Sequence, residues 1–336
     1  MTTVNDEVTA LVEAGDMDAA LEILAAANRE EENGHYQSRL LLIRHRKFVE
    51  TEQPAPIQPW PQAVPDLFAA VQGIPEIHAS ELTAEVASSA IQHHGSLLVR
   101  EWFPPDTCAA MRDAIDQSFA AADAVAEQDS FESTPWFRHF TPVRGKGFKL
   151  NRLARDFVRA GAGVLGVDSP RAMCRYLDCI YASGVDQFLH EYFGEPAAFS
   201  AKKTTLRRTP PDSSTGWHQD GSYFNGDVRA LNIWTAFSAC GVDSPSLDIV
   251  AQRFDAPLVE GGVQASEIVV DEDNAVQTGA HNIVRPVLGP GDAVLFDELA
   301  LHRTGVSPSM TETRYAIEMW FFAPSMFPQD EVPLYL

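Results

Sequence analysis

Residues 289–302 read Gly-Pro-Gly-Asp-Ala-Val-Leu-Phe-Asp-Glu-Leu-Ala-Leu-His, and this stretch indicates the fold more clearly than any other. A tight Gly-Asp turn precedes a short apolar run typical of a buried β-strand, and His302 follows where that run gives out. Similar runs recur after residue 197, separated by proline, glycine and aspartate; they span residues 198–209, 230–237, 247–250, 282–287 and 314–322. Several short strands at such intervals predict a β-sandwich or barrel.

The part of the chain that precedes these strands has a different pattern. Residues 82–94 and 105–126 have helical periodicity, and residues 95–100 between them have the composition of a strand. Helices followed by a long series of strands favour a mainly β fold with a helical layer on one side. We therefore predict a jelly roll of the cupin-like, double-stranded β-helix type.

The N-terminal region differs again in composition. Residues 6–50 have the spacing of a helical hairpin with a third helix, and prolines crowd residues 54–65, where their fixed φ and missing N–H exclude regular structure. We predict a helical N-terminal extension (1–52), a proline-rich linker or arm (53–79) and a main domain (80–336). The extension either covers apolar surface of the main domain or provides a surface for a homodimer or a docking partner.

Composition excludes several classes of function. The chain of 336 residues has a formal charge of -22, which repels phosphate backbones and anionic lipids, so we expect neither nucleic acid nor membranes as partners. The four cysteines lack zinc-type spacing and are expected to be reduced thiols. The N-terminus has acidic residues in place of the basic and apolar regions of a signal peptide. These features predict a cytoplasmic protein with a small-molecule substrate.

Three side chains have the spacing of a metal site. His218 and Asp220 lie two positions apart, and in an extended segment such residues point to the same side and reach one ion. His302 supplies a second imidazole at the end of a predicted strand. Two histidines and one carboxylate form the facial triad of iron(II) oxygenases, although zinc hydrolases use the same ligand types.

Arg314 favours an oxygenase over a zinc hydrolase. It follows His302 by twelve residues, so we expect a short turn to place it on the strand beside the one that ends at this histidine. A buried arginine needs an anion, and its planar guanidinium matches a carboxylate through two parallel hydrogen bonds. In a strongly acidic chain, a dianion such as 2-oxoglutarate needs such a local cation. The alternative is a structural ion pair with Glu318 on the same strand.

Together these motifs resemble the phytanoyl-CoA dioxygenase family over roughly residues 80–325, most closely over 204–320. The residues that carry the resemblance are His218-Gln-Asp220-Gly, Trp234-Thr-Ala, residues 290–297, His302 and Arg314. The resemblance implies a double-stranded β-helix that uses Fe(II), 2-oxoglutarate and O2. By position it assigns His218, Asp220 and His302 to the metal, Arg314 and Thr304 to the distal carboxylate of 2-oxoglutarate, and Thr205 and Trp234 to the pocket around it.

The resemblance also predicts the type of reaction. It implies oxidation of an unactivated C–H bond, by hydroxylation or a related outcome, with release of succinate and CO2. Related halogenases have alanine or glycine at the position of Asp220, so hydroxylation is favoured over chlorination. Residues 244–253 depart from the family pattern in a loop near the substrate entrance, so acyl-CoA need not be the substrate. The alternative from another class is a non-catalytic jelly-roll binding protein.

One segment is a candidate lid over the site. Residues 136–139 combine aromatic and basic side chains, and residues 144–149 are basic and punctuated by glycine. Such a segment either closes over a substrate or packs as an ordinary surface loop.

Overall fold

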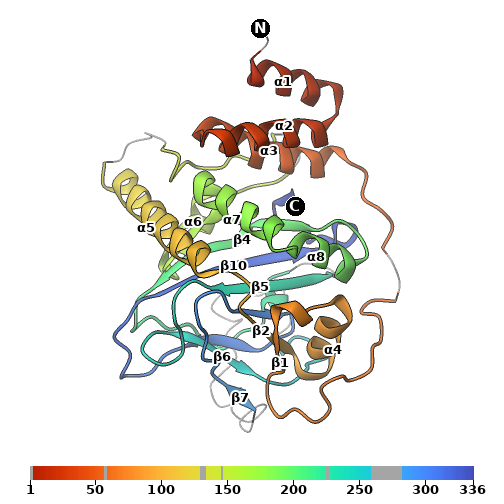
Figure 1. Cartoon of the computed structure of the whole chain (residues 1–336), viewed down its shortest axis with the longest axis vertical. Helices are drawn as coiled ribbons and strands as arrows, with labels where there is room; N and C mark the ends of the chain where they lie inside the picture. The colour runs from red at the N-terminus through yellow and green to blue at the C-terminus, as the bar shows by residue number, and fades with distance from the viewer. Residues whose placement is uncertain (1–2, 57–58, 129–133, 145–146, 225–226, 259–281) are drawn as a thin grey trace.

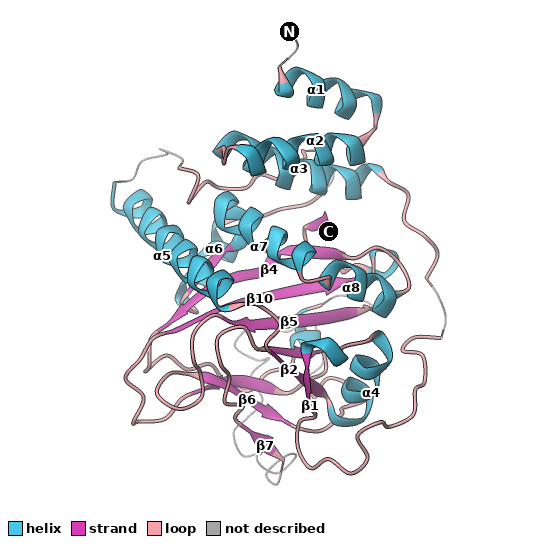
Figure 2. Ribbon diagram, in the orientation of Figure 1, coloured by secondary structure: helices cyan, strands magenta, loops and turns pink. Residues whose placement is uncertain are grey.

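The computed structural model describes residues 3–56, 59–128, 134–144, 147–224, 227–258 and 282–336. Its centre is formed by two β-sheets that face each other, and helices cover the outer face of the larger sheet (Figure 1). Figure 2 shows the strands gathered beneath a layer of helices, with the N-terminal helices stacked above them. This arrangement confirms the predicted double-stranded β-helix with a helical layer.

The larger sheet contains eight strands in the order β1-β2-β8-β5-β10-β4-β11, with β3 also paired to β4. Only β1 and β2 are parallel; the other neighbours are antiparallel. The strands are β1 (Glu76–His78), β2 (Ser96–Arg100), β3 (Gly163–Leu165), β4 (Ala198–Thr209), β5 (Ala230–Ala236), β8 (Ala293–Phe296), β10 (Arg314–Phe322) and β11 (Pro333–Tyr335).

The smaller sheet has the order β7-β6-β9, formed by β7 (Ile283–Val284), β6 (Ser246–Val250) and β9 (His302–Gly305). On the free edge of β9, the backbone of His218 exchanges two hydrogen bonds with that of His302, with N···O distances of 2.9 and 3.0 Å. Strand β7 covers only two residues of the predicted strand 282–287, which is much shorter than expected. The backbone pairing of His218 with His302 brings together two residues that are 84 positions apart in the sequence.

The turn before β8 explains the Gly-Pro-Gly-Asp motif. Gly291 has φ 96°, and a Cβ at this position would lie 2.2 Å from the carbonyl oxygen of Phe103. Only glycine fits both the positive φ and this close approach. Asp292 then accepts hydrogen bonds from the backbone N–H groups of Gly289 and Glu101, which fixes the start of the strand.

Each face of the larger sheet packs in its own core, because successive side chains of a strand point to opposite sides. The inner face packs against the smaller sheet, with Trp234, Phe296 and Trp320 meeting Leu247 and Ile249 of β6. The outer face packs beneath the helices. These helices are α4 (Ala84–His94), α5 (Pro105–Gln128), α6 (Arg152–Ala160), α7 (Pro170–Ala182) and α8 (Val185–Phe193), of which the sequence patterns predicted only α4 and α5.

The N-terminal helices are α1 (Val4–Ala14), α2 (Met17–Glu30) and α3 (Gly34–Glu50), and α3 packs on the main domain. His45 donates from Nδ1 to the carbonyl oxygen of Pro333 (2.7 Å), and Arg44 donates to that of Tyr335 (3.1 Å). The Phe48 ring is tilted against the Tyr335 ring, with their centroids 5.2 Å apart. These contacts favour the interpretation of the extension as a cover over the main domain.

The proline-rich arm also lies on the main domain. Its Trp60 ring contacts Tyr192 and Phe193 of α8 at centroid distances of 5.6 and 6.1 Å. Residues 76–78, which the sequence pattern had placed in the arm, form β1 and pair with β2. The last part of the arm is thus the edge of the larger sheet.

The candidate lid is not positioned as a lid. The Trp136 ring lies against the guanidinium groups of Arg171 and Arg175 on α7, at 5.4 and 5.1 Å. Phe137 and Phe148 pack on the outer core, and residues 145–146 lie outside the described part of the chain. The interpretation as ordinary loop packing is therefore the better one.

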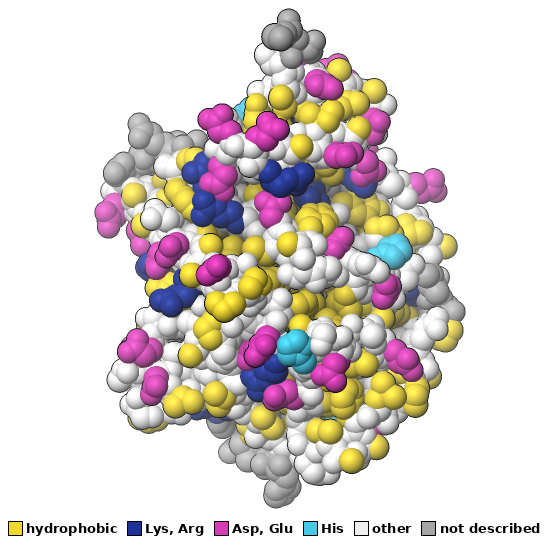
Figure 3. Space-filling model, in the orientation of Figure 1, with side chains coloured by type: hydrophobic (Ala, Val, Ile, Leu, Met, Phe, Trp, Pro, Cys, Tyr) yellow, Lys and Arg dark blue, Asp and Glu magenta, His cyan; other side chains and the backbone are white. Residues whose placement is uncertain are grey.

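Charged side chains of both signs lie on the surface of the protein. On the face seen in Figure 3, Lys and Arg side chains lie in small groups beside Asp and Glu side chains. Within the described ranges, no helix combines the length and the apolar character needed to cross a membrane.

Candidate metal centre and co-substrate site

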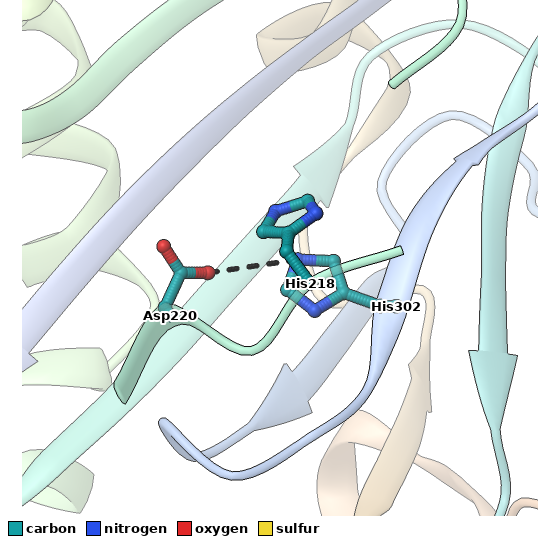
Figure 4. Close-up of side chains that lie close together, drawn as sticks. All are labelled: His218, Asp220 and His302. Carbon is teal, nitrogen blue, oxygen red and sulfur yellow. Dashed lines mark ion pairs between the residues drawn. The ribbon is translucent and has the colours of Figure 1, made fainter. Parts of the chain in front are cut away.

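The three predicted ligands meet at one end of the barrel. His302 begins β9, His218 is held beside it by the backbone pairing, and Asp220 follows in the short 3-10 helix Asp220–Tyr223. One potential ligand atom from each residue lies within 4.8 Å of the other two, and Figure 4 shows the three side chains converging. Asp220 and His302 are buried, and His218 is half-buried.

Hydrogen bonds orient both imidazoles toward this point. Nδ1 of His218 donates to the carbonyl oxygen of Gly216 (2.8 Å), and Nδ1 of His302 donates to that of Ala300 (3.0 Å). A carbonyl oxygen only accepts, so the proton is fixed on Nδ1 and the lone pair of each Nε2 remains available to a metal. In both histidines the acceptor is the carbonyl oxygen of the residue two positions earlier in the chain.

Asp220 completes the set. Its Oδ1 accepts from Nζ of Lys203 at 2.7 Å, whereas its buried Oδ2 lies 3.6 Å from Nε2 of His302 and accepts no hydrogen bond from the described residues. A buried carboxylate oxygen without a donor is costly. A divalent cation bound by Oδ2 and the two Nε2 atoms would remove this cost, so the donor set fits an iron(II) ion.

The electrostatic environment keeps the ligands in the forms that bind metal. Burial, with the neighbouring His302, lowers the pKa of His218 to about 4, so its ring is neutral at pH 7. Burial opposes ionisation of Asp220, but the Lys203 ammonium and the two imidazoles hold the pKa of its carboxyl below the usual range. At neutral pH the centre therefore offers neutral nitrogens and a carboxylate.

Arg314 begins β10 and is only 3% exposed. Its guanidinium donates to the carbonyl oxygen of Ser246 and to Oγ1 of Thr209, both at 2.9 Å, and its Nε has no partner. Burial lowers its pKa to about 10, so the group stays protonated at pH 7. No described carboxylate forms a salt bridge with it, which makes Arg314 a buried cation that lacks an anion.

The alternative partner of Arg314 is excluded, and one sequence expectation about this residue is wrong. Glu318 accepts instead from Arg207 at 2.7 Å. The strand expected to end at His302 is β8, which ends at Phe296 and pairs with β2 and β5, whereas β10 pairs with β4 and β5. His302 itself begins β9, which belongs to the other sheet. The connection after β9 crosses between the sheets, so Arg314 faces the interior from the larger sheet and does not lie on a strand adjacent to His302.

The other predicted pocket residues lie on the inner faces of the two sheets. The Trp234 ring lies 5.1 Å from Cζ of Arg314, and Thr205 is buried on β4 opposite Glu318. Thr304 on β9 exchanges hydrogen bonds with Thr215. The hydroxyl that contacts Arg314 belongs to Thr209, which the sequence analysis missed; its place in the β4–β10 register, opposite Arg314, would have identified it.

A cavity of about 460 Å³ is lined by the proline-rich arm, α8 and the segment that follows β8. None of the three candidate ligands lines it, but Gly221 in its wall directly follows Asp220. The Trp60 ring of the arm and Tyr192 of α8 form part of its wall. The volume falls in the range of cavities that hold small molecules.

Acidic and basic groups share the wall of this cavity. Arg253, which follows β6 in the stretch that departs from the family pattern, forms an ion pair with Asp297. Burial, together with the charge of Asp297, raises the pKa of Glu298 to about 8.

The barrel, the converging triad and the unpaired arginine define a class, the non-haem iron oxygenases with a double-stranded β-helix. A sequence model of the family described as phytanoyl-CoA dioxygenase (PhyH) matches residues 91–310, well over half of the 336 residues. The chain belongs to the phytanoyl-CoA dioxygenase family, which confirms the resemblance. It is thus a dioxygenase that uses iron and 2-oxoglutarate, and the zinc hydrolase and the non-catalytic binding protein are set aside.

Several solved structures are similar to this chain. The carbocyclase SnoK from nogalamycin biosynthesis is 14% identical, with a TM-score of 0.48 over 74% of this chain and 86% of SnoK. EctD from S. alaskensis, crystallised with 2-oxoglutarate and 5-hydroxyectoine, is 16% identical, with a TM-score of 0.49 over 83% of this chain and 89% of EctD. AviO1 from Streptomyces viridochromogenes Tue57 is 17% identical, with a TM-score of 0.43 over 71% and 94%. No curated protein matches the sequence.

Proposed function

We propose that His218, Asp220 and His302 bind the iron, that Arg314 binds the distal carboxylate of 2-oxoglutarate, and that the enzyme hydroxylates an unactivated C–H bond of a small molecule. This proposal rests on two polar groups inside the barrel that lack a partner among the described residues. Asp220 presents a carboxylate oxygen without a donor beside two oriented imidazoles, and Arg314 presents a guanidinium without an anion.

The residues of the chain account for binding and orientation. Three of the five N–H donors of Arg314 remain after its bonds to Ser246 and Thr209, enough for two parallel hydrogen bonds to a carboxylate. The Trp234 ring beside the guanidinium restricts its orientation and excludes water from this end of the pocket. Thr205 is assigned to the wall around the co-substrate, and Thr304 to the binding of its distal carboxylate.

When bound, iron and 2-oxoglutarate supply the oxidising chemistry, in which decarboxylation to succinate and CO2 accompanies oxygen transfer to a C–H bond. Asp220 occupies a ligand position with its own carboxylate, which favours hydroxylation over transfer of a halide. We assign the substrate to the cavity of about 460 Å³, because Gly221 in its wall directly follows the candidate ligand Asp220.

We propose, further, that the enzyme works in the cytoplasm and that its N-terminal helices stabilise the chain. All four cysteines are free, as expected in a reducing compartment. The contacts of His45 and Phe48 with the C-terminal strand support a covering role for α3 in preference to a docking surface for a second molecule.

The experiment that tests this function is anaerobic titration of the purified protein with Fe(II) and then 2-oxoglutarate. We expect one iron per chain and a weak visible charge-transfer band on addition of 2-oxoglutarate. His218→Ala, Asp220→Ala and His302→Ala should each abolish the band, while circular dichroism shows that the fold is intact. A band that persists in all three variants would exclude this site.

A further inference from the structure

Three carboxyl groups in the wall of the 460 Å³ cavity have no cationic partner among the described residues. They belong to Asp227, Asp255 and Glu298. The guanidinium in the same wall, that of Arg253, is already paired with Asp297. The described lining of the cavity thus holds four carboxyl groups against one guanidinium, which leaves a surplus of negative charge.

The charged groups behind the Trp60 ring do not remove this surplus. The guanidinium of Arg229 lies against that ring, with its Cζ atom 4.9 Å from the ring centre. Burial lowers the pKa of Arg229, and the nearby carboxylate of Glu195 opposes this effect. Because Arg229 and Glu195 carry opposite charges, together they add no net charge beside the cavity.

A buried hydroxyl points into the same cavity. Tyr192 of α8 lines the cavity and is only 8% exposed, and its hydroxyl forms no hydrogen bond with any described residue. The charged groups that raise or lower its pKa are Asp297, Glu298 and Arg253, all in the cavity wall, which places the hydroxyl on the cavity side. A buried polar group without a partner is costly, so this hydroxyl indicates a polar ligand.

The arrangement suits an organic cation better than a metal ion. Within the described ranges, only the three candidate metal ligands lie close enough together to hold a metal. The rings of Trp60 and Tyr192, in an edge-on contact at 5.6 Å, add aromatic surface that attracts organic cations. Burial and the charge of Asp297 oppose ionisation of Glu298, and a positive charge beside it would offset both effects.

We propose that the cavity binds the protonated amine of a small organic molecule, and that the substrate of the enzyme carries this charge. Glu298 and the Tyr192 hydroxyl accept hydrogen bonds from the ammonium, which has three donors. Asp227 and Asp255, which are exposed, increase its attraction from the solvent side. The proposal rests on the proposed function in taking this cavity as the substrate site, but binding of the cation requires neither iron nor 2-oxoglutarate.

The test compares three probes that differ only in charge: cyclohexylamine, cyclohexanol and cyclohexanecarboxylate. Each is titrated into the full-length protein at pH 7 and followed by ligand-observed NMR, at physiological ionic strength to screen the overall charge of the chain. We expect cyclohexylamine to bind at least tenfold more tightly than cyclohexanol, and cyclohexanecarboxylate to bind most weakly. A hydrogen bond to a charged group accounts for a difference of this size.

Variants locate the binding in the cavity. Glu298→Gln should weaken the binding of cyclohexylamine about tenfold and leave that of cyclohexanol nearly unchanged, and Tyr192→Phe should weaken it severalfold. The double variant Asp227→Asn, Asp255→Asn tests the same attraction at exposed positions if Glu298→Gln unfolds. Glu191→Gln is the matched control, because Glu191 precedes Tyr192 but is exposed and does not line the cavity.

Two results would overturn the proposal. Equal affinity for the amine and the alcohol would show that the cavity does not select a cation. A preference for the amine that persists in Glu298→Gln, Tyr192→Phe and the double variant would show that the acidic chain attracts amines elsewhere. Loss of the charge-transfer band without loss of amine binding would instead count against the proposed function, so the two failures are distinguishable.

Discussion

Replacement of Arg314 by alanine should selectively weaken the binding of 2-oxoglutarate. The guanidinium is 3% exposed, retains three N–H donors after its bonds to Ser246 and Thr209, and has no carboxylate partner among the described residues. Hydrogen bonds to charged groups contribute about 1.5–3 kcal/mol. The variant should therefore bind 2-oxoglutarate roughly tenfold to more than a hundredfold more weakly, because each 1.4 kcal/mol is about a factor of ten.

The assay is titration of 2-oxoglutarate into the iron-loaded protein under nitrogen, followed by the charge-transfer band. Arg314→Lys keeps the charge but loses the planar fork, so its affinity should fall between those of the wild type and the alanine variant. The metal affinity should change little in either variant, because Arg314 makes no contact with the three candidate ligands.

The matched control is Arg208→Ala. Arg208 is a neighbouring arginine on β4 that forms its ion pair with Asp116 of α5 on the outer side of the sheet. Its removal should leave the affinity for 2-oxoglutarate unchanged. Wild-type affinity in Arg314→Ala would refute the assignment of this residue to the co-substrate.

Three other predictions concern the reaction, the N-terminal helices and the response to pH. With Asp220 as a ligand, labelled dioxygen should place one oxygen atom in succinate, and a chlorinated product formed in chloride buffer would contradict this. Phe48→Ala removes a ring that is 9% exposed and packed against Tyr335, so it should lower the free energy of unfolding by about 3 kcal/mol, measured in urea; an unchanged value would show that α3 does not stabilise the main domain. Burial lowers the pKa of His45, so its contribution to stability is complete above its unfolded pKa of about 6.5 and declines as the pH falls below that value. Urea unfolding at pH 7.5 and 5.5 should show that the free energy of unfolding falls less on acidification in His45→Asn, whose amide still donates to Pro333, than in the wild type. An equal fall in the two proteins would contradict this interpretation.

The sequence by itself determined the strands that form the barrel and the residue types of the candidate site. The runs at 198–209, 293–296 and 314–322 coincide with β4, β8 and β10, because residues that favour strands are bounded there by glycine, proline and aspartate. The two-residue spacing of His218 and Asp220 already placed both on one side of an extended segment. The helices α6, α7 and α8 were not predicted, and the packing of α7 against α3 became visible only in the fold.

Only the tertiary structure decided which side chains are partners. Glu318 lies four residues from Arg314 in sequence, yet it pairs with Arg207 on the neighbouring strand, because register places Thr205 and Arg207 beside it. The lysine that binds Asp220 comes from β4, and no local pattern distinguishes Lys203 from Lys202. Contacts between charged groups depend on strand order, register and the face that each side chain occupies, and these are set by packing of the whole barrel, whereas strand positions are set by local apolar patterns.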